Sequence, residues 1–353
     1  MKLIHCADLH LDSPMESNLP VEKAKERRQE ILATFSKLVR HADENDADAI
    51  LIAGDLFDSK RTTRKTEQYI LDLMEAHPRL SFFYLAGNHD SGNNLLLREQ
   101  LPENLYTFGE SWTSYDFGEV YITGSEAPDP DTLELPADRI NILLLHGQQK
   151  DSATKEKDEI PFRKYRNKHV DYMALGHLHD YREAKLDERG LACYAGCLEG
   201  RGFDECGRKG YVLLETKQGR LSHTFVPFAR RTLHEIRCPL TGCTTHREAE
   251  ERLLEAVSSI PSGDLLKVIL TGELPPNDRP DLSALGSLLA EKFYFVKCVD
   301  EIRMEIRPED FAHDVSLKGE FVRRVMASPL SDLEKEQIIA CGIRALGGEE
   351  LDL

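Results

Sequence analysis

The chain has 353 residues, of which 41% are hydrophobic, enough to form a large core together with a smaller second unit. Its formal net charge of -17 excludes nucleic-acid binding through bulk positive charge, so a phosphate-bearing ligand would need a local positive field. No run of about 18 apolar residues occurs and the start lacks a signal-peptide pattern, so the sequence predicts a cytoplasmic protein that binds no membrane.

Up to about residue 230, short apolar runs alternate with amphipathic stretches, which is the pattern of an α/β fold. Eight strands are predicted, at residues 2–7, 49–53, 81–86, 120–123, 140–145, 172–175, 192–195 and 211–215. Two helices are predicted at residues 21–45 and 66–76, because apolar side chains such as Phe35 and Ile70 recur there at helical spacing.

Five polar motifs each follow one of these apolar runs. They are Asp8-Leu9-His10, Gly54-Asp55, Gly87-Asn88-His89-Asp90, His146-Gly147 and Gly176-His177-Leu178-His179. Loops at the carboxyl ends of strands converge in α/β sheets, so motifs far apart in sequence can meet at one edge. Each motif taken separately is also found in ordinary turns, but their occurrence together favours the ligand set of a two-metal phosphoesterase.

The spacing within the motifs suggests how they could reach metal ions. Alternate residues of an extended segment project to one side, so Asp8 and His10 can reach one ion. The same alternation applies to His177 and His179. Gly54 lets the backbone approach another group closely, and the carboxylate of Asp55 could then bridge two cations.

Cationic residues that could contact phosphate lie close to the second motif. They are Lys60, Arg61, Arg64 and Lys65, at the predicted entry to a helix, where backbone amides favour anions. The alternative is a solvated basic turn. Weaker candidates are the run Arg163, Lys164, Arg166 and Lys168, and the set Arg201, Arg208 and Lys209 beside a glycine-rich stretch. We expect Trp112 to pack rather than to stack on bases, and the eight cysteines to be free thiols because they lack zinc-site spacing.

Past residue 230 the pattern changes to a small α+β unit. Strands are predicted at 232–239, 265–270 and 295–306, the last as one strand or two, with helices from Thr245 to about 259 and at 282–293. A helical pair follows at 317–327 and 331–346. We therefore expect three segments, at residues 1–230, 231–307 and 308–353.

The motifs resemble those of the calcineurin-like metallophosphoesterases, and within them most closely the SbcD-like and Mre-type DNA repair nucleases and the YhaO-like proteins. The residues that carry the resemblance are the runs 8–12, 54–58, 87–90 and 176–179. The resemblance implies a four-layer αββα sandwich followed by a cap domain and a C-terminal helical pair. It also implies two divalent ions, usually manganese with iron as an alternative, a homodimer, DNA as substrate and an SbcC-like coiled-coil ATPase as partner.

Position by position, the resemblance also implies a ligand set. One ion would be held by Asp8, His10, Asp55 and His179, and the other by Asp55, Asn88, His146 and His177. His89 would be left free as the catalytic histidine. Asp90 is expected to orient the turn or an imidazole of one of the ligands rather than to bind metal. Some of these nucleases have a further histidine shortly before the Gly-Asp pair, but residues 51–53 contain none, so no second catalytic histidine is assigned there.

The sequence thus predicts a manganese-dependent DNA nuclease, with the balance between exonuclease and endonuclease activity open. Two alternatives stay open, a small-molecule or cyclic-nucleotide phosphodiesterase of the same fold and a non-catalytic DNA-end scaffold. The helical pair is expected to bind the ATPase partner or, alternatively, to pack on the protein's own cap.

Overall fold

The structure, a computed structural model, describes residues 1–15, 19–58, 62–90, 100–150, 158–274, 280–304, 311 and 313–346. The chain forms two compact units, Met1–His234 and Glu235–Leu353. The predicted boundary at residue 230 lies near the division between these units. The predicted boundary at 308 falls outside the described residues.

The first sheet of the first unit contains the three strands that precede the first three motifs. Its order is β14 (Arg220–Pro227), β13 (Gly210–Lys217), β1 (Lys2–Cys6), β2 (Ala49–Ala53), β3 (Ser81–Leu85) and β4 (Leu105–Thr107). Strands β1 to β4 are parallel, whereas β13 pairs antiparallel with β1. The carboxyl ends of β1, β2 and β3 therefore lie at one edge of this sheet.

The second sheet contains the strands that precede the last two motifs. Its order is β11 (Arg182–Lys185), β12 (Leu191–Tyr194), β10 (Tyr172–Gly176), β7 (Ile140–His146), β6 (Val120–Gly124) and β5 (Thr113–Phe117). Strands β12, β10, β7 and β6 are parallel. The two sheets bury one core between them, to which Leu51 and Phe83 contribute from the first sheet and Leu144 and Ala174 from the second.

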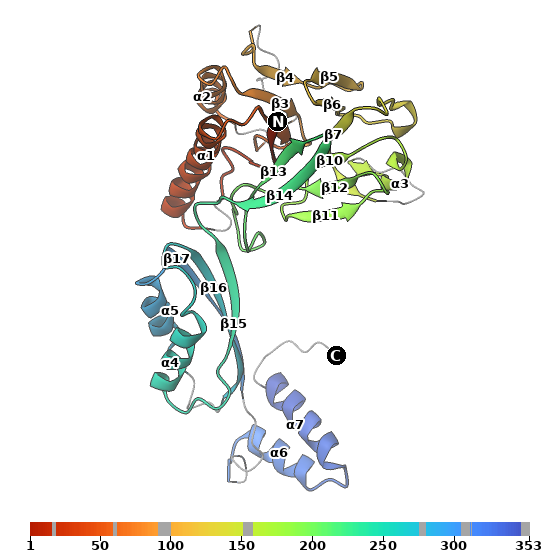
Figure 1. Ribbon diagram of the computed structural model, residues 1–353. Helices are drawn as coiled ribbons and strands as arrows, with labels where there is room; N and C mark the ends of the chain where they lie inside the picture. Colours follow the sequence, from red (N-terminus) through yellow and green to blue (C-terminus); the bar gives the residue numbers. More distant parts are fainter. Residues whose placement is uncertain are drawn as a thin grey trace. The chain divides into compact units, whose positions relative to one another are not determined.

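Helices cover the outer faces of the two sheets and complete four layers (Figure 1). On the first sheet lie α1 (Val21–Glu44), which buries Phe35, and α2 (Arg64–Glu75), whose first turn is capped by the Thr63 side chain. On the second sheet lie α3 (Phe162–Tyr165) and the short helix η2 (Pro130–Thr132), and a two-stranded sheet, β8 (Gln148–Gln149) with β9 (Glu159–Ile160), precedes α3. This architecture confirms the predicted αββα sandwich.

The second unit contains a three-stranded sheet with two helices. The strands are β15 (Leu233–Pro239), β16 (Leu265–Leu274) and β17 (Phe295–Met304), and the helices are α4 (His246–Ala256) and α5 (Leu282–Ala290). Helix α5 ends three residues before the predicted end, although Phe293 is still buried in this core. Residues 295–304 form one strand rather than two.

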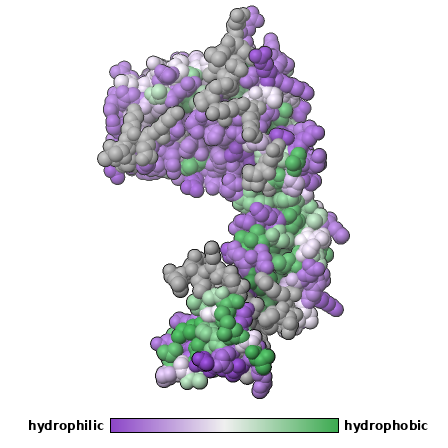
Figure 2. Space-filling view, turned by 180° about the vertical axis from the view of Figure 1, so that it is seen from behind, coloured by the Kyte–Doolittle hydropathy of each residue, from purple (hydrophilic) through white to green (hydrophobic). Residues whose placement is uncertain are grey.

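Two further helices follow, α6 (Leu317–Met326) and α7 (Asp332–Leu346). Helix α7 begins with the predicted capping box, because Ser331 N donates to Glu334 at 2.9 Å and Glu334 N donates to Ser331 Oγ at 3.3 Å. Val322, Ile339 and Ile343 are buried between the two helices. Other apolar side chains of the pair stay on its surface (Figure 2), including Leu317 at 71% exposure and Leu333 at 66%.

Candidate metal centre

All seven predicted ligand residues lie at the carboxyl ends of parallel strands. Strands β1, β2 and β3 lead into Asp8 and His10, Asp55, and Asn88, while β7 ends at His146 and β10 leads into His177 and His179. These ends belong to both sheets and meet at one edge of the sandwich. The convergence that the motif order predicted is thus present.

The backbone at this edge is held in unusual conformations. Asp8, His10 and Asp55 have φ values of 50°, 45° and 51°, in the left-handed region that non-glycine residues rarely adopt. Two backbone hydrogen bonds tie the loops together, from Asp8 N to Gly54 O at 3.1 Å and from His10 N to Asp55 O at 2.9 Å. Asp8 and His10 therefore reach one ligand group from left-handed backbone conformations, and the prediction of an extended segment from their spacing was wrong.

Gly54 fills the role expected for it. Its φ is 87°, and a Cβ atom at this position would lie 2.1 Å from His146 Nδ1. Any side chain would displace the imidazole of His146 from the edge, so glycine is required for a close approach between the two sheets.

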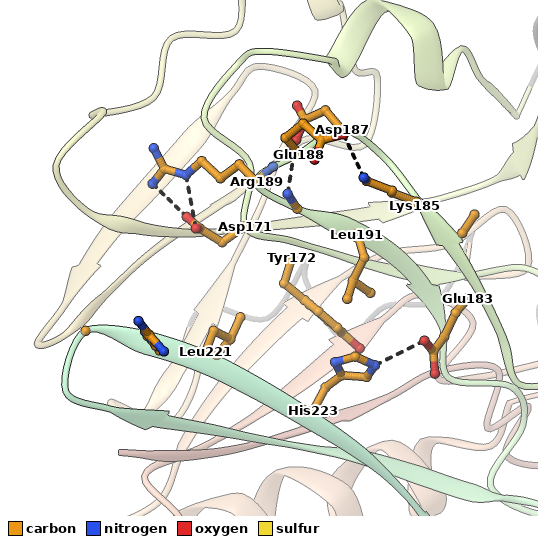
Figure 3. Close-up of a pocket in the computed structure, with 14 residues that line it drawn as sticks. Asp171, Tyr172, Glu183, Lys185, Asp187, Glu188, Arg189, Leu191, Leu221 and His223 are labelled. Carbon is orange, nitrogen blue, oxygen red and sulfur yellow. Dashed lines mark hydrogen bonds and ion pairs between the residues drawn. The ribbon is translucent and has the colours of Figure 1, made fainter.

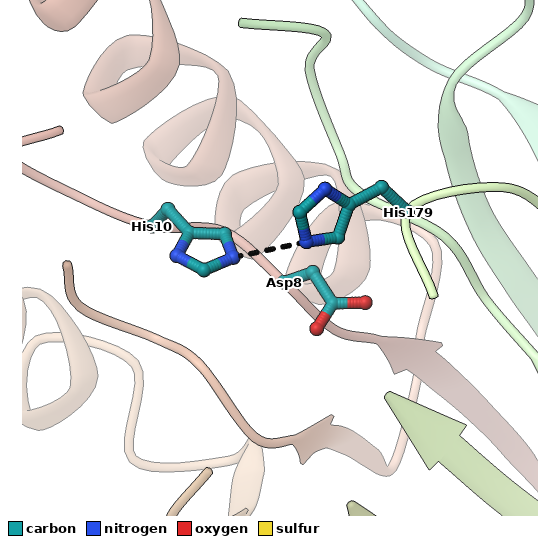
Figure 4. A group of neighbouring side chains, drawn as sticks. All are labelled: Asp8, His10 and His179. Carbon is teal, nitrogen blue, oxygen red and sulfur yellow. Dashed lines mark hydrogen bonds between the residues drawn. The ribbon is translucent and has the colours of Figure 1, made fainter. Parts of the chain in front are cut away.

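The first ligand group contains Asp8, His10 and His179 (Figure 4). The Nε2 atoms of the two histidines face each other at 3.2 Å, and one ligand atom from each of the three residues lies within 4.8 Å of the others. Asp8 Oδ2 and His10 Nδ1 are buried and have no hydrogen-bond partner among the described residues. Buried polar atoms without partners are rare, and a bound cation would satisfy the carboxylate oxygen.

The second ligand group surrounds His146. Its Nε2 atom lies 2.9 Å from Asn88 Oδ1 and 3.3 Å from Asp55 Oδ2, and its ring centroid lies 5.4 Å from that of His177. Asp55 Oδ2 also lies 3.7 Å from His10 Nε2 in the first group. One carboxylate oxygen is therefore shared by both groups. His177 and His179 belong to different ligand groups. The resemblance implied this division, whereas the spacing of the two residues suggested that they would reach the same ion.

Burial and charge together set the protonation of these residues. Burial raises the pKa of Asp8 to about 7 and lowers that of His10 to about 2. Burial alone would lower the pKa of His146, but hydrogen bonding to Asp55 and the charges of Asp55 and Asp8 raise it to about 9. Conversely, burial would raise the pKa of Asp55, but His146 holds it at about 2. In the absence of a cation, His146 therefore holds a proton at neutral pH. The pKa of His179 is raised as well, because its burial is outweighed by the hydrogen bond to Glu205 and by the charges of Asp8 and Glu205.

These residues fit a pair of divalent cations. The donors are carboxylate and amide oxygens together with imidazole nitrogens, a mixture that suits manganese and iron better than calcium. The unpaired buried oxygen of Asp8 and the shared oxygen of Asp55 are the structural features that such ions would satisfy.

His89 lies at the entrance of this edge, where it forms a third group of possible ligand residues with His10 and Asp58, one ligand atom of each lying within 4.8 Å of the others. Its side chain is 47% exposed, and its ring centroid is 5.0 Å from that of His10. Its Nδ1 atom lies 3.6 Å from Asp58 Oδ1, and His89 N donates to Asp55 Oδ1 at 2.8 Å. No role was predicted for Asp58, which follows Asp55 by three residues. The signal that could have found it is the second aspartate of Gly54-Asp55-Leu56-Phe57-Asp58.

Two further carboxylates support the ligands from behind. Asp90 accepts hydrogen bonds from Gly87 N and Phe57 N, both at 2.8 Å, and so orients the turn as expected. Glu205 Oε1 lies 2.7 Å from His179 Nδ1. Nothing in the sequence pattern indicated Glu205, because it lies 26 residues after His179 in an irregular stretch.

The predicted phosphate contacts are only partly described. Lys60 and Arg61 lie outside the described residues, whereas Arg64 and Lys65 are exposed in the first turn of α2. Lys209 was wrongly expected to face substrate, because its ammonium is buried and donates to His179 O at 2.9 Å and to Asp180 at 2.7 Å. Arg201 likewise pairs with Glu205.

Three other sequence predictions concern side chains away from this edge. In the second basic run, Lys164 pairs with Asp131 at 2.8 Å. Trp112 packs against the core of the second sheet, as predicted, and its Nε1 donates to Asp129 O at 2.9 Å. All eight cysteines lie within the described residues and form no disulfide, as predicted.

A separate hollow of about 730 Å³ lies near the amino ends of β10 and β12 (Figure 3). Its charged residues pair with one another, for example Arg189 with Asp171 at 2.8 Å and His223 with Glu183 at 3.2 Å. It therefore does not extend the metal-ligand edge, which lies at the opposite ends of these strands.

No helix among the described residues is long and apolar enough to cross a membrane. The family model of the calcineurin-like phosphoesterases matches residues 1–181, just over half of the 353 residues. This region contains all seven ligand residues and His89.

Three curated relatives extend the similarity. The chain is 28% identical over 248 residues to an uncharacterised metallophosphoesterase, YhaO, of Bacillus subtilis, a match that covers 64% of this chain and 60% of that protein. Matches to proteins named DNA double-strand break repair protein Mre11 are 26% identical in Methanosarcina acetivorans, covering 66% of this chain, and 30% identical in Sulfurisphaera tokodaii, covering 53%. The matched regions span 39% and 51% of those two relatives. The chain thus matches less than two thirds of the length of each relative.

Proposed function

This chain belongs to the calcineurin-like phosphoesterase family, and we propose that it is a two-metal phosphodiesterase that cleaves DNA, of the SbcD-like nuclease type. The observation that carries the proposal is Asp55 Oδ2, which lies between two groups of ligand residues at 3.3 Å from His146 and 3.7 Å from His10. DNA as the substrate class is supported by the names of the Mre11 relatives.

The residues present would hold two ions. Asp8, His10, Asp55 and His179 would hold one, and Asp55, Asn88, His146 and His177 the other. Manganese is the proposed metal and iron the alternative, because both accept mixed oxygen and nitrogen ligands. Two bound divalent ions would supply Lewis-acid activation of a water nucleophile and stabilise the charge of the transition state.

The protein's own residues would supply the proton chemistry. His89 is exposed at the entrance and lies outside the proposed ligand set, so it would reach the leaving oxygen of a phosphodiester and donate a proton to it. Asp58, whose carboxylate lies 3.6 Å from His89 Nδ1, would orient the ring. Because Nδ1 of His89 faces Asp58, Nε2 is the ring nitrogen that would face the substrate.

The surface features are consistent with a DNA backbone and a protein partner. Arg64 and Lys65, with Lys60 and Arg61 before them, would contact phosphates beside the metal centre despite the acidic total charge. The exposed apolar side chains of α6 and α7, such as Leu317 and Leu333, would bind a coiled-coil ATPase of the SbcC type. A homodimer and a cytoplasmic location stay predictions.

One comparison of substrates tests the proposal. The purified protein with Mn²⁺ is expected to cleave duplex or single-stranded DNA and also bis-p-nitrophenyl phosphate, and chelation should abolish both activities. Hydrolysis of the small diester without DNA cleavage would identify a small-substrate phosphodiesterase instead. DNA binding without hydrolysis of either substrate would indicate a non-catalytic scaffold.

A further inference from the structure

The segment after β12 places a buried carboxylate directly behind one predicted ligand. Glu205 is 4% exposed, and its Oε1 atom lies 2.7 Å from His179 Nδ1. An ionised carboxylate can only accept a hydrogen bond, so Nδ1 of His179 must carry the proton. The lone pair of His179 is then on Nε2, the atom that faces His10 Nε2 at 3.2 Å.

Arg201 fixes this carboxylate from within the same segment. Its Nη2 atom donates to Glu205 Oε1 at 2.7 Å, and its backbone N donates to Oε2, also at 2.7 Å. Both carboxylate oxygens are thus held by one residue, four positions earlier in the chain. The 3.2 Å approach of Arg201 Nη2 to His179 Nδ1 follows from their sharing the Oε1 atom.

The segment is in turn anchored to helix α1. Arg27, which is fully buried, donates to Glu199 Oε2 at 2.8 Å and to Gly200 O at 3.0 Å. Thr34, further along α1, donates to Glu199 Oε1 at 2.8 Å. Glu199 is only two residues before Arg201. The segment that carries Arg201 and Glu205 is therefore fixed to buried residues of the first unit.

The histidines of the other ligand group are supported differently. His146 Nδ1 lies 3.0 Å from the carbonyl oxygen of Ala53. The imidazole of His177 has no hydrogen-bond partner among the described residues, and its contact is an edge-to-face packing on His146. Within the described parts of the chain, a carboxylate at hydrogen-bonding distance from Nδ1 is therefore found behind His179, whereas the carboxylate recorded near His146 Nδ1 is that of Asp8, a proposed ligand, at 4.0 Å.

We propose that Glu205, held by Arg201, is a positioning residue that selects the Nδ1–H tautomer of His179 and fixes its ring, and so determines how tightly one of the two ions is bound. The proposal rests on the two-metal centre proposed above. A carboxylate that receives a hydrogen bond from a ligating histidine also makes that ligand more basic, and loss of such a partner commonly costs 10- to 100-fold in metal affinity.

Calorimetric titration of the full-length protein with Mn²⁺ tests this proposal, with electron paramagnetic resonance of the loaded protein as a second readout. Wild-type protein should bind two ions and show a spin-coupled pair. In Glu205→Ala, one ion should bind about 10- to 100-fold more weakly, and at limiting Mn²⁺ the coupled signal should give way to that of an isolated ion. Glu205→Gln should retain more affinity, because its amide oxygen still accepts from Nδ1–H.

Asp171→Asn is the matched control, since Asp171 also forms a two-point pair with an arginine, Arg189, but at the other end of the strands. It should bind both ions with wild-type affinity. Two ions bound by Glu205→Ala with wild-type affinities would overturn the proposal. If Glu205→Ala does not fold, Arg201→Ala and Glu205→Gln decide the question, and wild-type binding in both would overturn it as well. Wild-type protein that binds no Mn²⁺ would instead contradict the metal centre itself, before any variant is compared.

Discussion

His89 and Asp58 form the residue pair that separates catalysis from metal binding. His89→Asn should bind both ions, because His89 lies outside the proposed ligand set, but hydrolysis should fall by at least about 10²-fold through loss of the proposed general acid. Asp58→Asn leaves His89 in place and should reduce activity less. The measurements are metal content by elemental analysis and turnover of a DNA substrate.

The matched control for this pair is Asp55→Asn. Because Asp55 Oδ2 is shared by the two ligand groups, this variant should lose at least one ion as well as activity. An ion missing from His89→Asn would show that His89 is a ligand, and its assigned role would then be wrong.

The protonation of His146 predicts how metal affinity depends on pH. Its pKa is raised from 6.5 to about 9 in the metal-free protein, so the ring is protonated at neutral pH, and an ion must displace that proton to bind. Apparent Mn²⁺ affinity should therefore rise with pH between 7 and about 8.5, and titrations in two buffers of different ionisation enthalpy should reveal proton release. Affinity that does not change over this range would contradict the role of His146 as a ligand.

The raised pKa of His146 also makes the stability of the metal-free protein depend on pH. A histidine whose pKa is raised on folding stabilises the metal-free protein fully below the unfolded value of 6.5, and this contribution is lost as pH rises towards 9. In the presence of a chelator, the contribution of His146 to the melting temperature should therefore decrease as pH rises from 7 to about 8.5, the same range in which Mn²⁺ affinity should increase.

At the scale of elements, the first turn of α2 gives a test of DNA binding. Arg64→Ala with Lys65→Ala should weaken DNA binding for all sequences and reduce the slope of log affinity against log salt by roughly one for each phosphate that is no longer neutralised. Both side chains are exposed, so folding should be unaffected. Turnover of bis-p-nitrophenyl phosphate serves as the control and should hardly change. An unchanged salt slope would place the DNA elsewhere.

The helical pair α6–α7 gives a second test at this scale. Leu317→Ser with Leu333→Ser alters side chains that are 71% and 66% exposed, so the melting temperature should stay near that of the wild type. Co-purification with an SbcC-type ATPase should nevertheless be abolished, because these side chains belong to the unpaired apolar surface. Val322→Ser is the contrasting variant. Val322 is buried between the helices, so this change should destabilise the pair itself.

The elements that the sequence predicted best are those that are buried. All eight strands predicted in the first 230 residues are present with ends within two residues, because β2 and β7, for example, are continuous apolar runs buried on both faces. The short edge strand β4 was not predicted, and neither were the edge strands β5, β11 and β14. Their residues are largely exposed or half-buried, so their extended conformation depends on pairing with β6, β12 and β13 and not on an apolar pattern of their own.

The candidate site was predictable to a similar degree. The proposed ligands occur in short motifs at strand ends, so their convergence could be inferred from the sequence, whereas their role as ligands stays a prediction. Asp58 and Glu205 could not be assigned, because their roles depend on which histidine each one faces, and that is determined by the packing of the two sheets. The left-handed backbone at Asp8 and His10 has the same origin, since it is maintained by hydrogen bonds to the neighbouring loop at Gly54 and Asp55.

At the scale of the whole molecule, a net charge of -17 has to be reconciled with a polyanionic substrate. The seven proposed ligands carry two negative charges, from Asp8 and Asp55, whereas two divalent ions bring four positive ones. The loaded centre is therefore locally positive within an acidic protein. The charge that attracts DNA would then depend on the presence of both metal ions.

Anomalous diffraction from crystals of the full-length protein grown with Mn²⁺ would show whether two ions bind at this centre. We expect two anomalous peaks at the carboxyl edge of the strands, one contacted by Asp8, His10, Asp55 and His179 and the other by Asp55, Asn88, His146 and His177. A single peak, or peaks that do not share the carboxylate of Asp55, would contradict the account.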